Sequence, residues 1–405
     1  MDSIENLLDG FKNKNIRCLA RLISKLENED SQKEEILAKL YGMTGRAMVL
    51  GVTGSPGAGK SSLVDRLTAA YRKKGNTVGI IAVDPTSPFT GGALLGDRIR
   101  MQEHAVDRGV YIRSMGTRGS LGGLARATKE AVKLLDAFGF DLVIIETVGV
   151  GQAELDIMHV ADTTLVVLTP GAGDSIQTIK AGIMEIADIF VVNKCDLQGA
   201  DRVVAEIKQM LDLQSKVLEW RPPVVKVSTL DDHGMSKLME TLDLHINYLT
   251  ESGLLAENRA ERTRREMLEI VDYKWHKLVS RQLDYKDNVR ELLNEVISGK
   301  ADPYSGSDQI IKYIIENTGL GAEGADLRQK GGQLLEILET ALVNLKNFSN
   351  REDMSEYRTY LHGQIYGLAI ALKLLYPGPG NLGERAAMSV RPVITEHSCS
   401  CQGEE

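Results

Sequence analysis

The sequence predicts an α/β fold with a mostly parallel sheet flanked by helices, and three observations lead to this prediction. Between residues 45 and 252, short apolar runs alternate with stretches of helical periodicity, which is typical of βαβ units and of a sheet covered on both faces. A glycine-rich loop joins the first apolar run to an amphipathic stretch. On either side of this region, apolar residues recur mainly at helical spacing, which indicates flanking helical regions.

Length and composition indicate several domains and argue against nucleic acid as a general partner. The 405 residues, of which 43% are hydrophobic, allow two or three domains with a sizeable core. The net charge of −8 argues against nucleic acid as a general partner, because proteins that bind nucleic acid usually carry positive charge. We expect an N-terminal helical arm at 1–44, an α/β domain at 45–252, a helical region at 253–315, a further helical extension at 316–376 and a flexible tail at 377–405.

Both flanking regions follow helical periodicity. In the arm, the apolar residues at this spacing are Leu7, Leu8, Phe11, Ile16, Leu19, Leu22, Ile23 and Leu26, followed after a polar stretch by Ile36, Leu37 and Leu40. On the C-terminal side, helices are expected over 257–299, 308–318, 326–348 and 354–375. The sequence Pro377-Gly378-Pro379-Gly380 would end the last helix.

The central region contains seven expected strands: Met48–Thr53, Val78–Val83, Val110–Ile112, Leu142–Ile145, Thr164–Leu168, Ile189–Val192 and Val224–Val227. Helices are expected between them at 60–74, 123–137, 175–187, 200–213 and 235–248. In open α/β sheets the strand ends supply the ligand-binding loops, so we expect the functional residues there.

The sequence favours a soluble, cytoplasmic protein. Met1 is followed by Asp2-Ser3-Ile4-Glu5, which lacks the pattern of a secretory signal. No apolar run reaches the ~20 residues that a membrane helix needs. The four cysteines are too few and too scattered for a disulfide framework. We therefore expect no membrane association.

The glycine-rich loop has the pattern of a phosphate-binding loop. It is Gly54-x4-Gly59-Lys60-Ser61, preceded by an apolar run and followed by an amphipathic stretch. Glycines let the backbone direct its N–H groups toward phosphates, and the helix N-terminus adds partial positive charge. Lys60 is expected to reach the β- and γ-phosphates, and the Ser61 hydroxyl to bind Mg²⁺. The expected nucleotide-binding residues of this segment are Gly54, Ser55, Gly57, Ala58, Gly59, Lys60, Ser61 and Ser62.

A second motif predicts selection of guanine, and with it GTP and GDP as ligands. Asn193-Lys194-x-Asp196 follows a later apolar run. The Asp196 carboxylate could accept hydrogen bonds from the guanine N1–H and exocyclic amine, whereas adenine offers no matching donor pair and would cost roughly 1–3 kcal/mol or more. The residues around Ser228 match a second guanine-contact loop loosely.

Acidic residues at strand ends are candidates for Mg²⁺ binding and for the chemistry of hydrolysis. Glu146 ends an apolar run and is expected to hold a Mg²⁺-bound water, with the Gly149 N–H sensing the γ-phosphate. Asp84 ends the second expected strand and Asp97 ends a glycine-rich segment. Either could act near Mg²⁺ or the attacking water.

The position after Gly149 holds Val150 rather than the glutamine that orients water in fast GTPases. Slow intrinsic hydrolysis that a partner accelerates is the resulting hypothesis, although Gln152 and Glu154 lie near and could substitute. The flexible segment Pro170-Gly171-Ala172-Gly173-Asp174 precedes Lys180 and could move it with nucleotide state.

Taken together, these segments resemble the MeaB/ArgK/MMAA family of P-loop GTPases. The resemblance runs from about residue 5 to 315, and it is carried by Gly51–Ser62, Val83–Met101, Gly116–Leu124, Glu146–Glu154, Pro170–Asp188 and Asn193–Asp196. It implies a chaperone that gates cofactor loading and protects or reactivates an adenosylcobalamin-dependent acyl-CoA mutase, such as methylmalonyl-CoA mutase. It also implies a homodimer built through the C-terminal helices at 253–315.

By the same resemblance, Lys60, Ser61, Asp84, Asp97 and Glu146 serve nucleotide, Mg²⁺ and hydrolysis, and Lys180 belongs to a third switch loop. The chain departs from the family by continuing for roughly ninety residues after the segment around Val296–Tyr304. This extension would either cap the dimer or dock a client. A metal-insertion GTPase and a transport-linked kinase are the alternative functions.

Two weaker patterns complete the sequence. His397, Cys399 and Cys401 could bind a soft metal. The basic run Arg259, Arg262, Arg264 and Arg265 is balanced by nearby glutamates, so we expect a solvated helix face there.

Overall fold

The computed structural model describes residues 3–84, 104, 106–116, 126–147, 153–171, 184–213, 219–285 and 287–317, together with Leu335, Leu338, Glu339, Ile365 and Ala386. The chain divides into two compact units, Met1–Met267 and Leu268–Glu405. The boundary lies within the long helix α9 (Leu254–Tyr285).

The first unit contains a seven-stranded sheet in which every pairing is parallel, and this confirms the predicted fold class. The strands are β1 (Met48–Gly54), β2 (Val78–Asp84), β3 (Val110–Gly116), β4 (Leu142–Glu146), β5 (Thr163–Leu168), β6 (Ile189–Val192) and β7 (Val224–Lys226). Their order is β3-β2-β4-β1-β5-β6-β7. β1 therefore lies between β4 and β5, where the strand order reverses and ligands of open sheets bind.

All seven expected strands are present, with small differences at their ends. The largest concerns β3, which continues to Gly116 instead of ending at Ile112. It does so because it stays in register with β2 as far as the pair Asp84↔Gly116. The polar Arg113 and Ser114 that interrupt its apolar pattern are accommodated because β3 is at the edge of the sheet.

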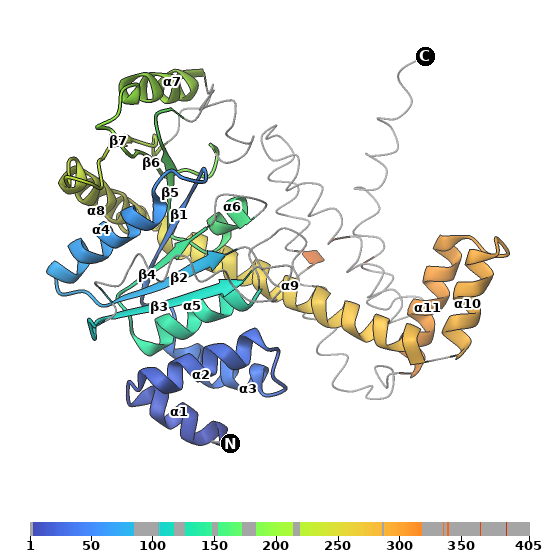
Figure 1. Cartoon of the computed structure of the whole chain (residues 1–405). Helices are drawn as coiled ribbons and strands as arrows, with labels where there is room; N and C mark the ends of the chain where they lie inside the picture. Colours follow the sequence, from blue (N-terminus) through green and yellow to red (C-terminus); the bar gives the residue numbers. More distant parts are fainter. Residues whose placement is uncertain are drawn as a thin grey trace, which may run out of the picture. The chain divides into compact units, whose positions relative to one another are not determined.

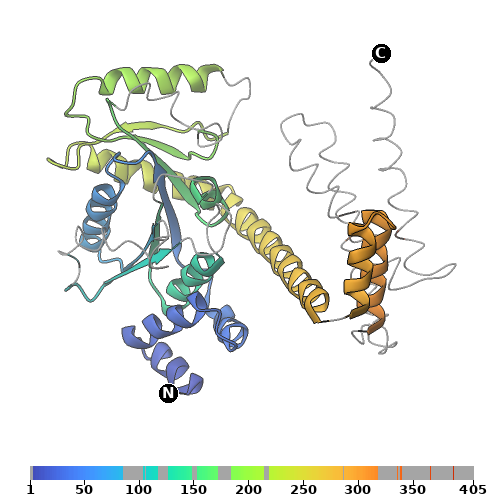
Figure 2. The same ribbon diagram turned by 45° about the vertical axis from the view of Figure 1, so that its right-hand side comes forward.

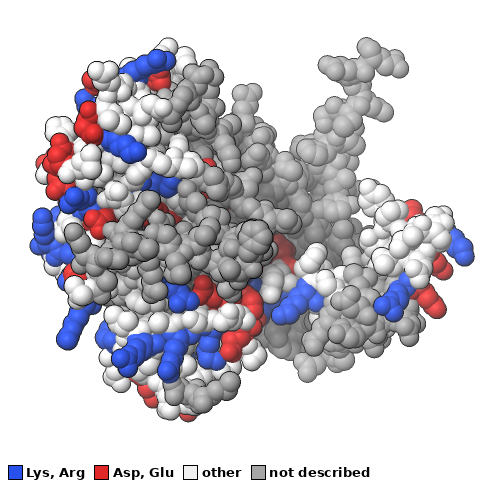
Figure 3. Space-filling view, in the orientation of Figure 1, with Lys and Arg blue, Asp and Glu red and all other residues white. Residues whose placement is uncertain are grey.

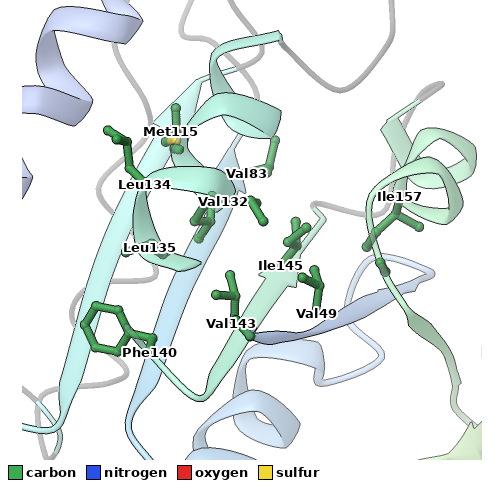
Figure 4. Packing of buried hydrophobic residues seen from close by; sticks show 14 of the residues in the cluster. Val49, Val83, Met115, Val132, Leu134, Leu135, Phe140, Val143, Ile145 and Ile157 are labelled. Atoms are coloured by element: carbon green, nitrogen blue, oxygen red, sulfur yellow. The ribbon is translucent and has the colours of Figure 1, made fainter. Parts of the chain in front are cut away.

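Helices cover both faces of the sheet (Figure 1). On one face, α4 (Lys60–Lys73) and α8 (Met235–Glu251) pack against inward residues such as Leu50 and Val52. On the other face, α5 (Arg126–Phe138), α6 (Ala153–Asp156) with η4 (Ile157–His159), and α7 (Ala200–Leu213) enclose a second core that contains Val49 and Val143. Figure 4 shows part of this second core, where Val143 and Ile145 of β4 lie near Val49 of β1.

The N-terminal arm is helical as predicted, but it consists of separate helices: α1 (Ile4–Lys12), α2 (Ile16–Glu27), α3 (Lys33–Leu40) and the short η1 (Tyr41–Met43). The break before α2 is stabilised by Asn15, whose side chain caps the Arg17 N–H at 2.9 Å. The arm packs on α5 (Figure 2), where the rings of Phe11 and Phe138 lie 5.2 Å apart. Its solvent side carries charged residues, and Lys and Arg are concentrated over these helices in Figure 3.

At the N-terminal ends of β1 and β5, α9 is attached to the sheet by buried charges, which corrects the expectation of a solvated arginine face. Arg259 and Arg262 both bind the Asp162 carboxylate, whose side chain has no exposed surface. Asp162 also accepts the Val49 N–H at 2.9 Å. The expectation fails because one helical face of the arginine run points at a buried acid, which sequence spacing does not show. Arg264, paired with its helix neighbour Glu261, is exposed as expected.

The second unit contains α10 (Asp287–Ile297) and α11 (Pro303–Asn317), which pack against each other. α11 begins five residues before the predicted start at 308. Asp302 caps it, because its Oδ1 accepts the N–H groups of Tyr304 and Ser305, and Pro303 suits the first helical position. The helices expected at 326–348 and 354–375 and the tail at 377–405 lie outside the described residues apart from isolated positions.

The helix predicted over 175–187 lies mostly outside the described residues as well. At its end, residues 184–186 form a turn rather than a helix. The chain there must reach the start of β6, and the Asp188 N–H donates to Thr164 O on β5 at 3.0 Å. Among the described residues, no helix has the length and apolar character needed to cross a membrane.

Candidate nucleotide-binding site

The loop between β1 and α4 has the backbone that a phosphate cradle requires. Gly54, Gly57 and Gly59 all have positive φ, at +134°, +75° and +85°, a region that other residues rarely adopt. Two of them also lie against neighbouring atoms. A Cβ on Gly54 would be 2.1 Å from Val167 O, and one on Gly59 would be 2.4 Å from Asn193 Nδ2. Only glycine therefore fits both the conformation and the space.

Lys60 and Ser61 form the start of α4 and are both nearly buried, at 6% and 8% exposure. The Lys60 ammonium donates to Gly54 O at 2.8 Å and to Ser55 O at 3.0 Å. It is thereby directed back across the loop. The structure thus places the positive charge of Lys60 beside the N-terminus of α4, and both favour the binding of an anion there. Ala58 is buried in the loop, and Ser62 is exposed on the first turn of α4.

Two of the predicted Mg²⁺ ligands are brought together. The Ser61 hydroxyl donates to Glu146 Oε1 at 2.6 Å, and Glu146 is only 4% exposed. Glu146 ends β4, where it pairs in register with Val52 of β1 and Ala82 of β2. A hydroxyl and a carboxylate are the oxygen ligands that Mg²⁺ prefers, so the residues present fit this ion.

The remaining candidates for Mg²⁺ and chemistry are described only partly or not at all. Asp84 is the last residue of β2, two positions beyond the partner of Glu146 on the neighbouring strand. Asp97, Gly149 and Lys180 lie outside the described residues. Of the suggested substitutes for the missing glutamine, Glu154 is 2% exposed in α6, and Gln152 also lies outside the described residues.

The guanine-type motif follows β6 and contacts the phosphate loop directly. The Asn193 side-chain amide donates to Ala58 O at 2.8 Å, and Lys194 Nζ donates to Gly57 O at 2.9 Å. Lys194 has a positive φ of 56°, an uncommon conformation for a lysine that is often found at functional sites. Asp196 is exposed at the surface. This motif and the phosphate loop, about 130 residues apart in the chain, therefore form one site.

Ser228 lies beside this motif in the loop that follows β7. Main-chain hydrogen bonds connect the two segments, since Cys195 N–H donates to Val227 O at 3.0 Å. Ser228 is 1% exposed. Burial raises the pKa of the Cys195 thiol, with Asp196 adding to the effect, and the partly buried side chain packs against the hydrophobic core.

Sequence reasoning missed two pairs of residues that shape the site. The Thr147 hydroxyl donates to Thr53 Oγ1 at 2.9 Å and joins the ends of β4 and β1 in a fully buried position. Arg66 of α4 reaches the loop after β7, with Nε 3.1 Å from Thr229 O. No local pattern marks either pair, because both are contacts between segments far apart in the sequence.

A parallel sheet with a glycine cradle, a buried lysine and serine, and an Asn-Lys-x-Asp loop against that cradle defines a P-loop GTPase. The sequence profile of the family described as Methylmalonyl Co-A mutase-associated GTPase MeaB matches residues 19–284. The chain belongs to this family. A putative GTPase of Pyrococcus abyssi is 50% identical over 315 residues, which cover 77% of this chain and 97% of that protein.

Two further comparisons extend this result. A Mus musculus protein named methylmalonic aciduria type A homolog, mitochondrial, is 31% identical over 333 residues, covering 76% of this chain and 79% of that protein. A solved structure described as LAO/AO transport system kinase superposes with a TM-score of 0.58 at 24% identity, covering 78% of this chain and 99% of that one. At this identity the structural likeness concerns the fold alone.

Proposed function

We propose that this GTPase is a chaperone of an adenosylcobalamin-dependent acyl-CoA mutase of the methylmalonyl-CoA mutase type. In this function it gates cofactor loading and protects or reactivates the mutase. Membership of a family named for its association with that mutase supports the proposal, as does the similarity to a methylmalonic aciduria type A homolog. The observation that carries the GTPase part is the phosphate cradle held against Asn193 and Lys194.

In the proposed site, the phosphates of GTP lie in the loop from Gly54 to Gly59. Lys60 would exchange its contacts with loop carbonyls for the β- and γ-phosphates. Ser61 and Glu146 would hold Mg²⁺, with Asp84 and Asp97 as further acidic candidates. When bound, the ion supplies positive charge that offsets the negative charge of the phosphates during transfer.

Guanine would be selected at the far end of the same site. Asp196 is exposed, and its carboxylate can accept the two donors of the guanine edge. Asn193 and Lys194 connect this position to the phosphate loop, and the main chain just before Ser228 is hydrogen-bonded to the motif through Cys195 N–H and Val227 O. We also propose that Gly149 senses the γ-phosphate and that Lys180 belongs to a switch loop.

Three properties of the proposed chaperone follow from its sequence, its helices and its cysteines. Intrinsic hydrolysis is slow, because Val150 cannot orient water, and the mutase accelerates it. The protein is a homodimer formed through the helices of 253–315. The long α9 supports this part, because it exposes the apolar residues Met267, Val271 and Trp275 to 49%, 55% and 38%. Free Cys18 and Cys195 fit a reducing cytoplasm.

The test is GTP turnover by the purified protein, alone and with a cobalamin-dependent mutase from the same organism. ATP serves as the nucleotide control, and Lys60→Ala serves as the variant that lacks the phosphate-binding charge. Slow GTP turnover that increases severalfold with the mutase supports the proposal. Fast unaided turnover contradicts the partner-completed site. Turnover that no cobalamin enzyme changes contradicts the chaperone function but not the GTPase.

A further inference from the structure

Arg66, on the second turn of α4, connects the phosphate helix to the loop that follows β7. Its Nε donates to the carbonyl oxygen of Thr229 at 3.1 Å and lies 3.3 Å from Oδ1 of Asp232. The Arg66 side chain is 39% exposed, so this contact is made at the surface between two elements. An exposed ion pair contributes little to folding stability. The main effect of this contact is therefore on the position of the loop that follows β7.

The loop that Arg66 contacts has an uncommon backbone. Asp232 has a φ of +59°, in the left-handed region that residues other than glycine, asparagine and aspartate rarely adopt. Within the loop, the Ser228 N–H donates to His233 O at 2.9 Å, and the His233 N–H donates to Asp231 Oδ1 at 3.2 Å. Such a conformation persists where surrounding contacts hold it, and Arg66 supplies one such contact from outside the loop.

The same loop is already connected to the phosphate cradle along a different path. The Asn193 amide donates to Ala58 O at 2.8 Å, and Cys195 N–H donates to Val227 O at 3.0 Å, directly before the loop. Arg66 closes this path into a ring of contacts that runs from the phosphate loop through both base-side loops and back to α4. Removing Arg66 would open the ring on the side of the 228–233 loop.

We propose that Arg66 is a positioning residue for guanine recognition, because it holds the 228–233 loop at a fixed position relative to the phosphate helix. This inference rests on the proposed role of the Asn193–Asp196 and Ser228 segments in binding the base. A nucleotide is bound at both ends at once, so the base-side loop must be ordered relative to the phosphates. Without Arg66, the loop would have to become ordered each time the base binds. The free-energy cost of this ordering would weaken binding of the base more than binding of the phosphates.

The experiment compares the affinities of the full-length protein for GDP and for ADP in the presence of Mg²⁺. The variants are Arg66→Ala, Arg66→Lys and Asp232→Asn. The matched control is Arg72→Ala, which removes the same side chain from the same helix. Arg72 binds Asp107 at 2.8 Å instead of the base-side loop. Melting temperatures are measured for every variant, so that loss of folding is recognised separately.

For Arg66→Ala we expect GDP affinity to decrease about three- to tenfold, an effect reduced by the exposure of the contact, while ADP affinity changes less than about twofold. Arg66→Lys should recover part of the loss, because an ammonium can still donate to Thr229 O. Arg72→Ala should leave the GDP-to-ADP ratio unchanged. An unchanged ratio in Arg66→Ala and Asp232→Asn would overturn the inference. A wild-type protein that binds GDP no better than ADP would instead overturn the proposed guanine selection itself.

Discussion

Ser61 and Glu146 are joined by a hydrogen bond of 2.6 Å, although 85 residues separate them in the chain. The bond connects the first turn of α4 with the end of β4, and both side chains are nearly buried. A serine hydroxyl needs an acceptor in such a place, and a carboxylate provides one while adding a negative charge. The hydrogen bond itself does not require this charge, whereas the proposed binding of Mg²⁺ would use it.

Glu146→Gln separates these two functions. The amide oxygen of glutamine can still accept the Ser61 hydroxyl, so we expect a melting temperature close to that of the wild type. The loss of charge should lower GTP turnover by roughly 10²-fold or more and raise the Mg²⁺ concentration needed for half-maximal rate. Turnover measured over a series of Mg²⁺ concentrations checks this prediction.

The control for this substitution is Asp141→Asn, which removes one negative charge next to the opposite end of the same strand. Asp141 accepts hydrogen bonds from Thr77 there, and these lower its pKa. We expect Asp141→Asn to affect stability only. A Glu146→Gln protein with wild-type turnover and wild-type Mg²⁺ dependence would remove Glu146 from the proposed ion site.

Gly59→Ala should damage the phosphate loop through both backbone strain and steric overlap. The residue has a φ of +85°, and an added Cβ would lie 2.4 Å from Asn193 Nδ2. Gly75→Ala is the matched control, since its φ is +87° and an added Cβ meets nothing within 4 Å. We expect Gly75→Ala to cost about 1–2 kcal/mol of unfolding free energy and no GDP affinity.

Gly59→Ala should cost more stability than this control and lower GDP affinity at least tenfold, because Asn193 must move from the loop. Urea unfolding and GDP titration measure the two effects. Equal behaviour of the two alanine variants would mean that the contact between Asn193 and the loop is not needed for binding.

The sheet and the phosphate loop could be predicted from sequence because their signals are local. Apolar runs buried on both faces mark strands such as β1 and β6, and the spacing of Gly54, Gly59 and Lys60 belongs to one turn. The guanine-type motif was also predictable, because it directly follows an apolar strand.

The contacts that fix these segments relative to one another could not be predicted in the same way. Arg66 and Asp162 act through partners that only folding brings near, at residues 229 and 259. Charge balance along the chain suggested a solvated face for Arg259, and this was wrong because the relevant acid, Asp162, lies directly before β5, 97 residues away in the chain. The local sequence indicates whether a charged residue tends to be exposed, whereas the identity of its ion-pair partner depends on how the fold brings distant segments together.

Asp162 should be one of the costliest charges to remove from the first unit. Its side chain is fully buried and accepts hydrogen bonds from Arg259, Arg262 and the Val49 N–H. Replacing it with alanine leaves two arginines and one backbone donor without their acceptor. We expect Asp162→Ala to lower the unfolding free energy by about 3–5 kcal/mol, measured by urea unfolding.

Arg259→Ala should cost less, because Arg262 still neutralises Asp162. The control is Arg264→Ala on the same helix, whose pair with Glu261 is exposed and should contribute less than about 1 kcal/mol. If Arg259→Ala and Arg264→Ala have the same small effect, the buried cluster does not attach α9 to the sheet.

The pH dependence of stability should reveal His245, a buried histidine of α8 that contacts the first residue of β5. Burial lowers the pKa of His245 from 6.5 to about 4, and its side chain, 2% exposed, lies 2.9 Å from Thr163 Oγ1. Between these two pKa values, the unfolded chain binds a proton that the folded protein does not. His245 therefore destabilises the fold by up to about 3 kcal/mol as the pH decreases from 6.5 to 4.

Asp188, 3.6 Å from His245, has the opposite effect. Burial raises the pKa of its carboxyl from 3.8 to about 7, so the folded protein retains a proton that the unfolded chain releases. Its contribution favours the fold at low pH and is lost as the pH rises through 7. The side chain is 35% exposed, so solvent should make this slope the smaller of the two.

Single substitutions should therefore give opposite pH profiles of stability. In His245→Asn, which can keep a hydrogen bond to Thr163, the free energy of unfolding should decrease less than in the wild type as the pH falls from 6.5 to 4. In Asp188→Asn, the decrease over the same range should become steeper than in the wild type, because the compensating carboxyl is gone. Urea unfolding at pH 4, 5, 6 and 7 measures both profiles. Parallel profiles for the wild type and both variants would show that neither group titrates differently in the folded and unfolded states.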